Sequence, residues 1–436
     1  MAKITFLGAG STVFTKTVLG DCMQSDVLSD SQIALYDIDP IRLDDSKKML
    51  ENIKENLGVK AEITAYDNPT EAFKDANYII NAIQVGGYEP CTVTDFEIPK
   101  KCGLRQTIAD TIGIGGIFRA LRTIPVMLDY AKIMEDVCPD AWLLNYANPM
   151  GMLTGALLKG SNVKTVGLCH SVQVCTKSLF KSLDMEYDDN IVQKVAGINH
   201  MGWLLEVKRK GKDIYPEIKA RLAELENSGE LNTKNLIRLE IMKKFGYYVS
   251  ESSEHSAEYM PYFIKAQYPE LIEKYKIPLD EYPRRCVNQI NKWKTMREEL
   301  INDKDLSHER SNEYASYIIE AMETNIPYEI GGNVINNGLI SNLPKEACVE
   351  VPCMINGNGV NPCYVGKLPE QLAALNRTTV NVQLLTIEAV LTRKKEYIYH
   401  AAMLDPHTSS ELSCKDIYSL VDDLIEAHGE WMPEYK

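Results

Sequence analysis

The amino-acid sequence predicts an α/β protein that begins with a Rossmann-like, doubly wound parallel sheet and continues into a second, mixed α/β (α+β) domain. Over the first 170 residues, short apolar runs alternate with helical patterns, which is typical of parallel strands joined by crossover helices. The first apolar run leads directly into a glycine turn. Polar side chains follow several of these runs, at the strand ends where such sheets bind ligands.

Six apolar runs are predicted to form the strands of the first sheet. They are residues 4–8, 33–37, 62–66, 78–83, 142–146 and 165–169. Six strands suit a doubly wound, dinucleotide-binding fold. We therefore assign residues 1–196 to an NAD-binding, Rossmann-like domain.

The remaining residues, 197–436, are predicted to form a C-terminal domain that closes over the first. An extended segment at 203–207 precedes charged helical stretches at 218–226, 233–245 and 284–304. Extended structure returns at 333–352, and two final helices are predicted at 375–399 and 417–428. The charge-rich helices are interpreted as solvated faces. With these two domains, the predicted architecture is similar to that of lactate and malate dehydrogenases.

Composition and charge restrict the class of protein. A chain of 436 residues with a formal net charge of −14 does not suit binding to nucleic acid or to an anionic membrane. No run approaches the roughly 18 apolar residues of a membrane span, and the first strand follows Met1 without a signal-like segment. Eleven scattered cysteines without a C-x-x-C pair predict buried thiols and a reducing, cytoplasmic location.

The first glycine turn predicts a cofactor site. Gly8 and Gly10 provide the tight turn and the close backbone approach to a pyrophosphate, and Ser11 begins the next helix. Val13 occupies the position of the usual third glycine. Asp37 ends the second predicted strand, where a carboxylate binds the adenosine ribose and repels a 2′-phosphate. NAD is therefore favoured over NADP.

A metal site is predicted at the ends of two further apolar runs. Cys169 ends the sixth run, and His200 closes the next one, 31 residues later. Both residue types are metal ligands, and as a bare pair they would favour zinc by their softness. Packing or hydrogen-bonding roles remain open for both. Asn148, after the fifth strand, points to the same crevice or caps the helix that follows.

Motifs along nearly the whole chain resemble glycoside hydrolase family four, the NAD- and manganese-dependent glycosidases. They include the opening turn and Asp37, the glycine-rich segment that starts at Asp110, and the later motifs at 145–149, 169–171, 197–200, 258–259 and 342–352. Within that family, Cys-Asn-x-Pro is typical of phospho-glucosidases. The sequence Cys-His-Ser-Val at 169–172 instead resembles the α-galactosidase branch, which cleaves melibiose.

The resemblance implies a hydrolase that works by oxidation and elimination. NAD accepts the hydride from C3 of the sugar, and the resulting ketone acidifies the C2 proton. Loss of that proton expels the glycosidic oxygen, water adds, and the hydride returns. A divalent cation, which the family implies to be manganese, would stabilise the charge on the sugar oxygens. Cys169 and His200 would be its ligands, and Tyr259 would remove the C2 proton.

The resemblance also suggests roles for four further residues. His170 would donate a proton to the leaving group, or would only hydrogen-bond a sugar hydroxyl. Asp110 is expected to bind a hydroxyl of the substrate, as is Asn148. His255, four residues before Tyr259, is either a substrate contact or structural. Arg119 and Arg122 are interpreted as mainly structural, and Tyr262 is an alternative base.

Three alternatives stay open. A dehydrogenase of the lactate and malate type would need a histidine–aspartate pair and an arginine, which the sequence alone does not reveal. A catalytically silent NAD-binding regulator would not need Cys169, His200 and Tyr259 together. Within the family, α-glucosidase or α-glucuronidase activity also stays open, because the choice of sugar rests on two residues, His170 and Ser171. The expected partner is a small α-galactoside, and we expect the protein to be a homo-oligomer.

Overall fold

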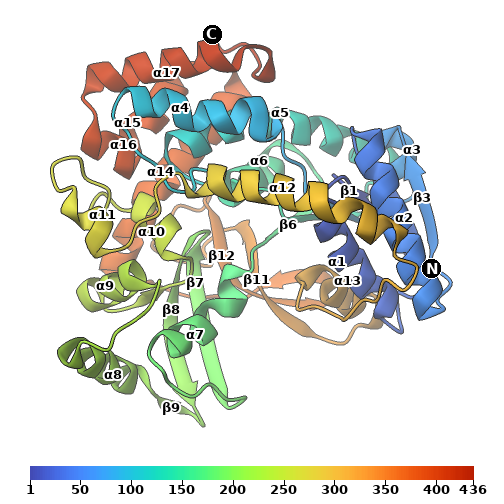
Figure 1. Ribbon diagram of the computed structural model, residues 1–436, viewed down its shortest axis with the longest axis horizontal. Coiled ribbons are helices and arrows are strands. Elements are labelled where there is room, and N and C mark those ends of the chain that lie inside the picture. The colour runs from blue at the N-terminus through green and yellow to red at the C-terminus, as the bar shows by residue number, and fades with distance from the viewer.

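The computed structural model describes residues 1–436, which form a mixed α/β structure (Figure 1). The six predicted strands form one parallel sheet in the order β3-β2-β1-β4-β5-β6. Their bounds are β1 (Lys3–Leu7), β2 (Gln32–Tyr36), β3 (Glu62–Tyr66), β4 (Tyr78–Asn81), β5 (Trp142–Asn145) and β6 (Lys164–Leu168). This order is that of a doubly wound dinucleotide-binding sheet, so the predicted fold class is confirmed.

Crossover helices connect these strands. They are α1 (Thr12–Gln24), α2 (Pro40–Leu57), α3 (Pro69–Phe73), α4 (Val93–Lys101), α5 (Gly113–Val137) and α6 (Met150–Gly160), with a short π-helical segment at Gly87–Thr92. Helix α2 shows how the sequence sets such bounds. The Asp39 side chain caps its first turn, Pro40 occupies the first helical position, and Gly58 ends it in a left-handed conformation.

The sheet continues beyond β6 in antiparallel pairing. The next strands in order are β11 (Tyr328–Ile335), β12 (Cys348–Asn356), β7 (Ile191–Ile198), β8 (Met201–Arg209) and β10 (Tyr248–Val249). Strands β9 (Lys212–Asp213) and β13 (Gly359–Pro362) pair with β8 and β12. One sheet therefore runs through both predicted domains. The predicted division between residues 196 and 197 falls inside β7, and it stays a prediction.

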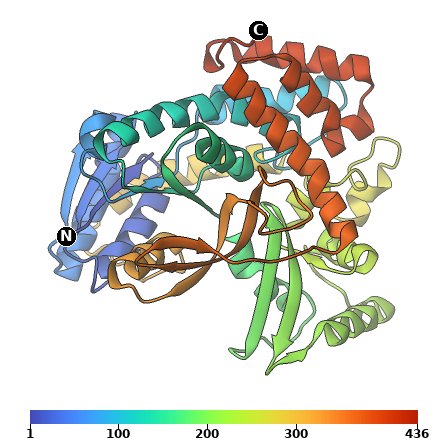
Figure 2. The same ribbon diagram turned by 180° about the vertical axis from the view of Figure 1, so that it is seen from behind.

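The helices of the second half lie around this extension (Figures 1 and 2). They are α7 (Ser171–Ser182), α8 (Tyr215–Ser228), α9 (Leu236–Phe245), α10 (Ser253–Tyr259), α11 (Glu270–Lys274), α12 (Glu281–Asn302), α13 (Tyr314–Thr324), α14 (Glu370–Thr392), α15 (Glu396–Leu404), α16 (Pro406–Glu411) and α17 (Cys414–His428), with a short 3₁₀ turn at Gly429–Trp431. Figure 2 shows the red C-terminal helices gathered at one end of the molecule, where α15 and α17 contact α5 and α4.

One predicted helix was wrong in its extent. The single helix expected at 375–399 is two helices, because Arg393 adopts a left-handed φ of 59° and ends α14. The chain then turns, and α15 begins at Glu396. An arginine carries no sequence signal for this conformation, which usually favours glycine or asparagine.

A core of 93 buried hydrophobic residues joins both halves of the chain, and a second cluster of 15 lies mainly beneath α7, α8 and α9. All eleven cysteines are unpaired, and six of them are buried, as expected of small apolar residues. None of the helices combines the length and the apolar character that crossing a bilayer requires.

Candidate functional site

The turn between β1 and α1 has the geometry of a nucleotide-binding loop. Gly8 has a φ of +90°, a conformation that glycine adopts without strain. The Gly10 N–H donates to the Asp37 carboxylate at 2.6 Å, and a Cβ atom at Gly10 would lie 2.7 Å from that carboxylate. Ser11 stands immediately before α1. The four residues predicted for cofactor binding therefore lie together at one edge of the sheet.

Two adjoining cavities, of about 290 and 400 Å³, lie at the carboxyl ends of β4, β5 and β6. Five of the residues predicted from the sequence line both of them: Asp110, Asn148, Cys169, His170 and His200. The first cavity extends to α1 and to residues 82 and 83, whose backbone lies against Gly8. The cavity and the nucleotide-type turn are thus contiguous.

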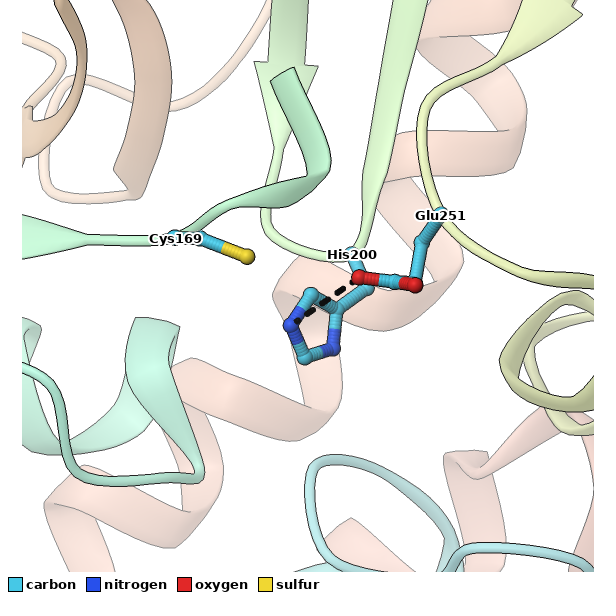
Figure 3. Close-up of side chains that lie close together, drawn as sticks. All are labelled: Cys169, His200 and Glu251. Atoms are coloured by element: carbon cyan, nitrogen blue, oxygen red, sulfur yellow. Dashed lines mark ion pairs between the residues drawn. The ribbon is translucent and has the colours of Figure 1, made fainter. Parts of the chain in front are cut away.

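Cys169, His200 and Glu251 point toward one another at the edge of this cavity (Figure 3). Their sulfur, nitrogen and oxygen donor atoms all lie within 4.8 Å of one another. The Nε2 atom of His200 is 3.6 Å from Oε2 of Glu251, while its Nδ1 atom is hydrogen-bonded to the Thr111 hydroxyl at 3.2 Å. Burial raises the pKa of the Cys169 thiol, and the nearby carboxylates Glu350 and Glu251 raise it further.

Asp110 organises the polar wall of the cavity. Its carboxylate accepts from the Asn148 amide at 3.3 Å and lies 3.5 Å from Nε2 of His255. Although burial opposes its charge, the contact with His255 and the nearby Arg119 guanidinium hold the pKa of Asp110 below its usual range. Burial also opposes the charge on His255, but Asp110 and Glu251 together outweigh it, so the pKa of His255 is raised. The structure thus brings three predicted residues into one charged network.

His170 occupies the outer side of the cavity. Its Nε2 atom is 2.5 Å from Oε2 of Glu313, and its side chain is about half exposed. The hydrogen bond to Glu313 raises the pKa of His170, because the carboxylate stabilises the imidazolium. A protonated imidazole facing the cavity is able to donate a proton to a bound ligand.

Tyr259 is placed less directly than the sequence suggests. Its hydroxyl is 3.2 Å from the backbone N of His200 and 3.4 Å from the Asn199 carbonyl. The side chain is fully buried and lines neither cavity. Burial raises the pKa of Tyr259 well above its usual value. Tyr262, the alternative base, is half exposed and is not among the cavity residues either.

Glu258 fixes the loop that leads to Asp110. Its buried carboxylate accepts three backbone hydrogen bonds, from Thr107 at 2.6 Å, Ile108 at 3.2 Å and Ala109 at 3.1 Å. Asp110 follows these donors directly, so its position depends on α10, which carries Glu258. Glu258 and Tyr259 form the motif at 258–259, so its first residue also contributes to the site, by holding the loop before Asp110 in place.

Sequence reasoning missed several residues of the site. Glu251 and Glu313 stand in polar segments without a motif, and a spacing of four residues between Glu251 and His255 was the only available signal. Arg119, interpreted as structural, lines the first cavity and donates to the Tyr282 hydroxyl at 3.0 Å. Arg122 does have the structural role expected of it, in a buried ion pair with Asp95 at 2.6 Å.

The fold and the site define an α/β enzyme in which a nucleotide-type turn adjoins a cavity lined by side chains of metal-binding types. The chain belongs to family 4 of the glycosyl hydrolases: residues 3–185 match the family's glycosyl hydrolase domain, and residues 195–408 match its C-terminal domain. The family predicted from the sequence motifs is therefore confirmed.

Comparison with individual proteins agrees with this assignment. The chain is 63% identical to an α-galactosidase of Bacillus subtilis over 436 residues, which is the whole of both proteins. A 6-phospho-α-glucosidase from gut microorganisms, solved in complex with NAD and Mn²⁺, has a TM-score of 0.82 at 21% identity and covers 100% of each chain. A malate dehydrogenase from Plasmodium falciparum has a TM-score of 0.51 at 15% identity, covering 90% of this chain and 99% of its own. This last likeness confirms the predicted dehydrogenase-like architecture as a fold.

Proposed function

We propose that this protein is an α-galactosidase that requires NAD and a divalent cation, manganese. One observation carries the proposal: side chains able to ligate a metal and polar groups able to bind a sugar converge in a cavity contiguous with a nucleotide-type turn, in a family 4 chain. The 63% identity to an α-galactosidase and the sequence Cys-His-Ser-Val at 169–172 support the choice of sugar.

The turn suits the cofactor. With no Cβ at Gly8 or Gly10, the backbone approaches β4 and Asp37 more closely than any other residue would allow. The N-terminal turn of α1 supplies backbone N–H groups for a pyrophosphate. Asp37 would hold the adenosine ribose, which supports NAD rather than NADP.

The cluster of three donors suits a divalent cation. Such ions lie about 2.0–2.3 Å from nitrogen, oxygen and sulfur ligands, so the donors of one ion are at most about 4 to 5 Å apart. Cys169 and His200 would hold it, each near a strand end. When bound, NAD supplies reversible oxidation at C3 of the sugar, and the cation supplies polarisation of the neighbouring oxygens.

Side chains that line the cavity, and the buried Tyr259 behind His200, would carry out the remaining steps. Tyr259 is the proposed base for the C2 proton, and its hydroxyl contacts the backbone of His200, a proposed ligand of the cation. Burial raises the pKa of Tyr259, whereas the positive charge of a bound cation would lower it and favour the phenolate. His170 is the proposed acid, since Glu313 favours its protonated form. Asp110, Asn148 and His255 would bind sugar hydroxyls as acceptors and donors.

The competing function is that of a true dehydrogenase, and one observation favours it. His255 and Asp110 form a histidine–aspartate pair, and Arg119 lines the first cavity together with Asp110. A dehydrogenase would accumulate NADH in proportion to product. The proposed hydrolase returns the hydride in each cycle, and turnover in heavy water leaves deuterium at C2 of the released galactose.

The deciding experiment is a panel of nitrophenyl α-galactoside, α-glucoside, α-glucuronide and 6-phospho-glucosides. Each is assayed with and without NAD, Mn²⁺ and a thiol reductant. We expect cleavage of the α-galactoside that requires all three additions. Preference for another sugar would reassign the substrate within the family, and activity without NAD would refute the oxidation and elimination mechanism.

The proposal extends to the assembly and the location of the protein. We propose a homo-oligomer in the cytoplasm, where the unpaired Cys169 would stay reduced. Light scattering of the purified protein tests the assembly, and fractionation of the cells that produce it tests the location.

A further inference from the structure

Glu251 stands out among the residues that the family resemblance did not identify. It lies between β10 and α10, and Figure 3 shows its carboxylate directed toward His200 and Cys169. The side chain is 19% exposed. Its Oε1 atom accepts a hydrogen bond from the Ser252 N–H at 2.7 Å. Its Oε2 atom accepts no hydrogen bond from the protein and faces Nε2 of His200 at 3.6 Å.

That separation is too long for a hydrogen bond and suits two ligands of one ion. Nδ1 of His200 is already engaged by Thr111, so Nε2 is the nitrogen free to bind a cation. The third donor, Sγ of Cys169, lies within 4.8 Å of both. On binding a cation, the Cys169 thiol would release its proton, and the thiolate and the Glu251 carboxylate would together balance the charge of a divalent ion.

We infer that Glu251 is a third protein ligand of the catalytic cation, alongside Cys169 and His200. The inference rests on the proposed function, since it concerns the cation of that same site. Its consequence is selectivity. Thiolate and imidazole alone favour zinc, whereas carboxylate oxygen suits manganese and magnesium. The carboxylate of Glu251 would therefore shift the preference of the site from zinc toward manganese.

The test measures metal binding rather than turnover. Full-length protein is stripped of metal, and the affinities for Mn²⁺ and Zn²⁺ are measured by Mn²⁺ electron paramagnetic resonance and calorimetry. The variants are Glu251→Gln, Glu251→Asp and Cys169→Ser. Glu254→Gln is the matched control, because Glu254 lies three residues later, in the first turn of α10, and pairs with Arg285 at 3.4 Å. Circular dichroism and NAD affinity confirm that each variant folds.

We expect Glu251→Gln to weaken Mn²⁺ binding by at least about tenfold, the scale of losses at metal sites, and to weaken Zn²⁺ binding less. Glu251→Asp should recover part of the Mn²⁺ affinity. In the Co²⁺-loaded protein, Glu251→Gln should alter the d–d bands, which report the coordination number, while the thiolate-to-cobalt band persists. A residue that only positions His200 would leave the d–d bands unchanged.

Two results would overturn the inference, and they are distinguishable. If Glu251→Gln binds Mn²⁺ like the wild type while Cys169→Ser does not, the cation site stands and Glu251 is not a ligand. If the wild type itself does not bind Mn²⁺, or if Cys169→Ser binds it equally well, the metal assignment of the proposed function fails as well.

Discussion

Among single residues, Glu350 shows how strongly burial changes the pKa of a carboxyl group near the site. Its Oε1 atom accepts from the amides of Asn333 at 3.1 Å and Asn199 at 3.3 Å, while its Oε2 atom has no partner. Burial raises the pKa of Glu350 to about 7, against the opposing effects of His200 and Asn333. The folded protein therefore favours the neutral carboxyl, whereas the unfolded chain titrates near 4.5.

This shift predicts a pH-dependent stability. Because the folded pKa is raised, the stabilising effect is complete below about pH 4.5 and is lost as the pH rises through about 7. Glu350→Gln keeps the shape of the neutral carboxyl and cannot ionise. We expect metal-free wild type to lose up to about 3 kcal/mol of unfolding free energy relative to Glu350→Gln between about pH 5 and pH 8. Urea unfolding checks this, and parallel pH profiles would contradict it.

Gly10 offers a second test at this scale. A methyl group there would lie 2.7 Å from the Asp37 carboxylate, so Gly10→Ala must displace the residue proposed to bind the ribose. We expect the Kd for NAD to rise by at least about tenfold, which corresponds to about 1.4 kcal/mol. Mn²⁺ affinity should be unchanged. Calorimetric titration with NAD measures the effect, and an unaltered Kd would argue against this turn as the cofactor site.

Among the elements, α10 and the loop before Asp110 depend on one another through Glu258. Glu258→Gln would place an amide NH₂ or a weaker carbonyl acceptor against three N–H donors. We expect a loss of about 1–3 kcal/mol in stability and a fall in kcat from the displaced Asp110, with little change in the Kd for NAD. Thermal unfolding and steady-state kinetics measure both. Normal kcat in a destabilised variant would show that the loop position does not matter for turnover.

The elements were predictable from the sequence to the extent that local patterns determine them. All six parallel strands were found because each is a short run of strand-forming residues bounded by turns, and all except the edge strand β3 are mostly buried. The interpretation of α12 as a solvated face was incomplete. Most of its surface is exposed, yet Tyr282 and Cys286 line a cavity and Arg297 pairs with the buried Asp45 at 2.6 Å. Asp45 and most of the other residues that line this cavity lie more than 100 residues away in the sequence, so no local pattern indicates these contacts.

For the candidate site too, local patterns indicate some residues, whereas others depend on long-range contacts. Cys169 and His200 stand at strand ends, and the topology of the sheet makes such positions converge. Glu251 reaches the second cavity, and Glu313 reaches His170, only through the path of irregular segments after β10 and α12, which propensity does not predict. The buried position of Tyr259 depends on the packing of α10 behind His200, and this too is a tertiary effect.

At the scale of the whole molecule, the continuous sheet and the joint core predict cooperative unfolding. The main hydrophobic core contains residues from both predicted domains, and β12 links β11 to β7 by hydrogen bonds. We expect a single calorimetric transition whose van't Hoff and calorimetric enthalpies agree. Two resolved transitions would instead show that residues 1–196 and 197–436 are independent units.

Metal and redox state are tested on the same intact molecule. We expect chelation, oxidation of thiols, Cys169→Ser and His200→Ala each to abolish turnover while NAD affinity and the unfolding temperature change little, because the donors lie at the surface of a cavity rather than in the core. Full activity after exhaustive chelation would remove the metal from the mechanism.

The uninterrupted sheet also bears on how such a protein diversifies. Strands β3 to β10 pair without interruption, and this pairing holds the segments that end in Cys169 and His200 in one sheet. Side chains of the cavity wall that would bind sugar hydroxyls, such as Asn148, can then be exchanged while Cys169 and His200 keep their places. A rigid frame of this kind separates the evolution of specificity from that of chemistry.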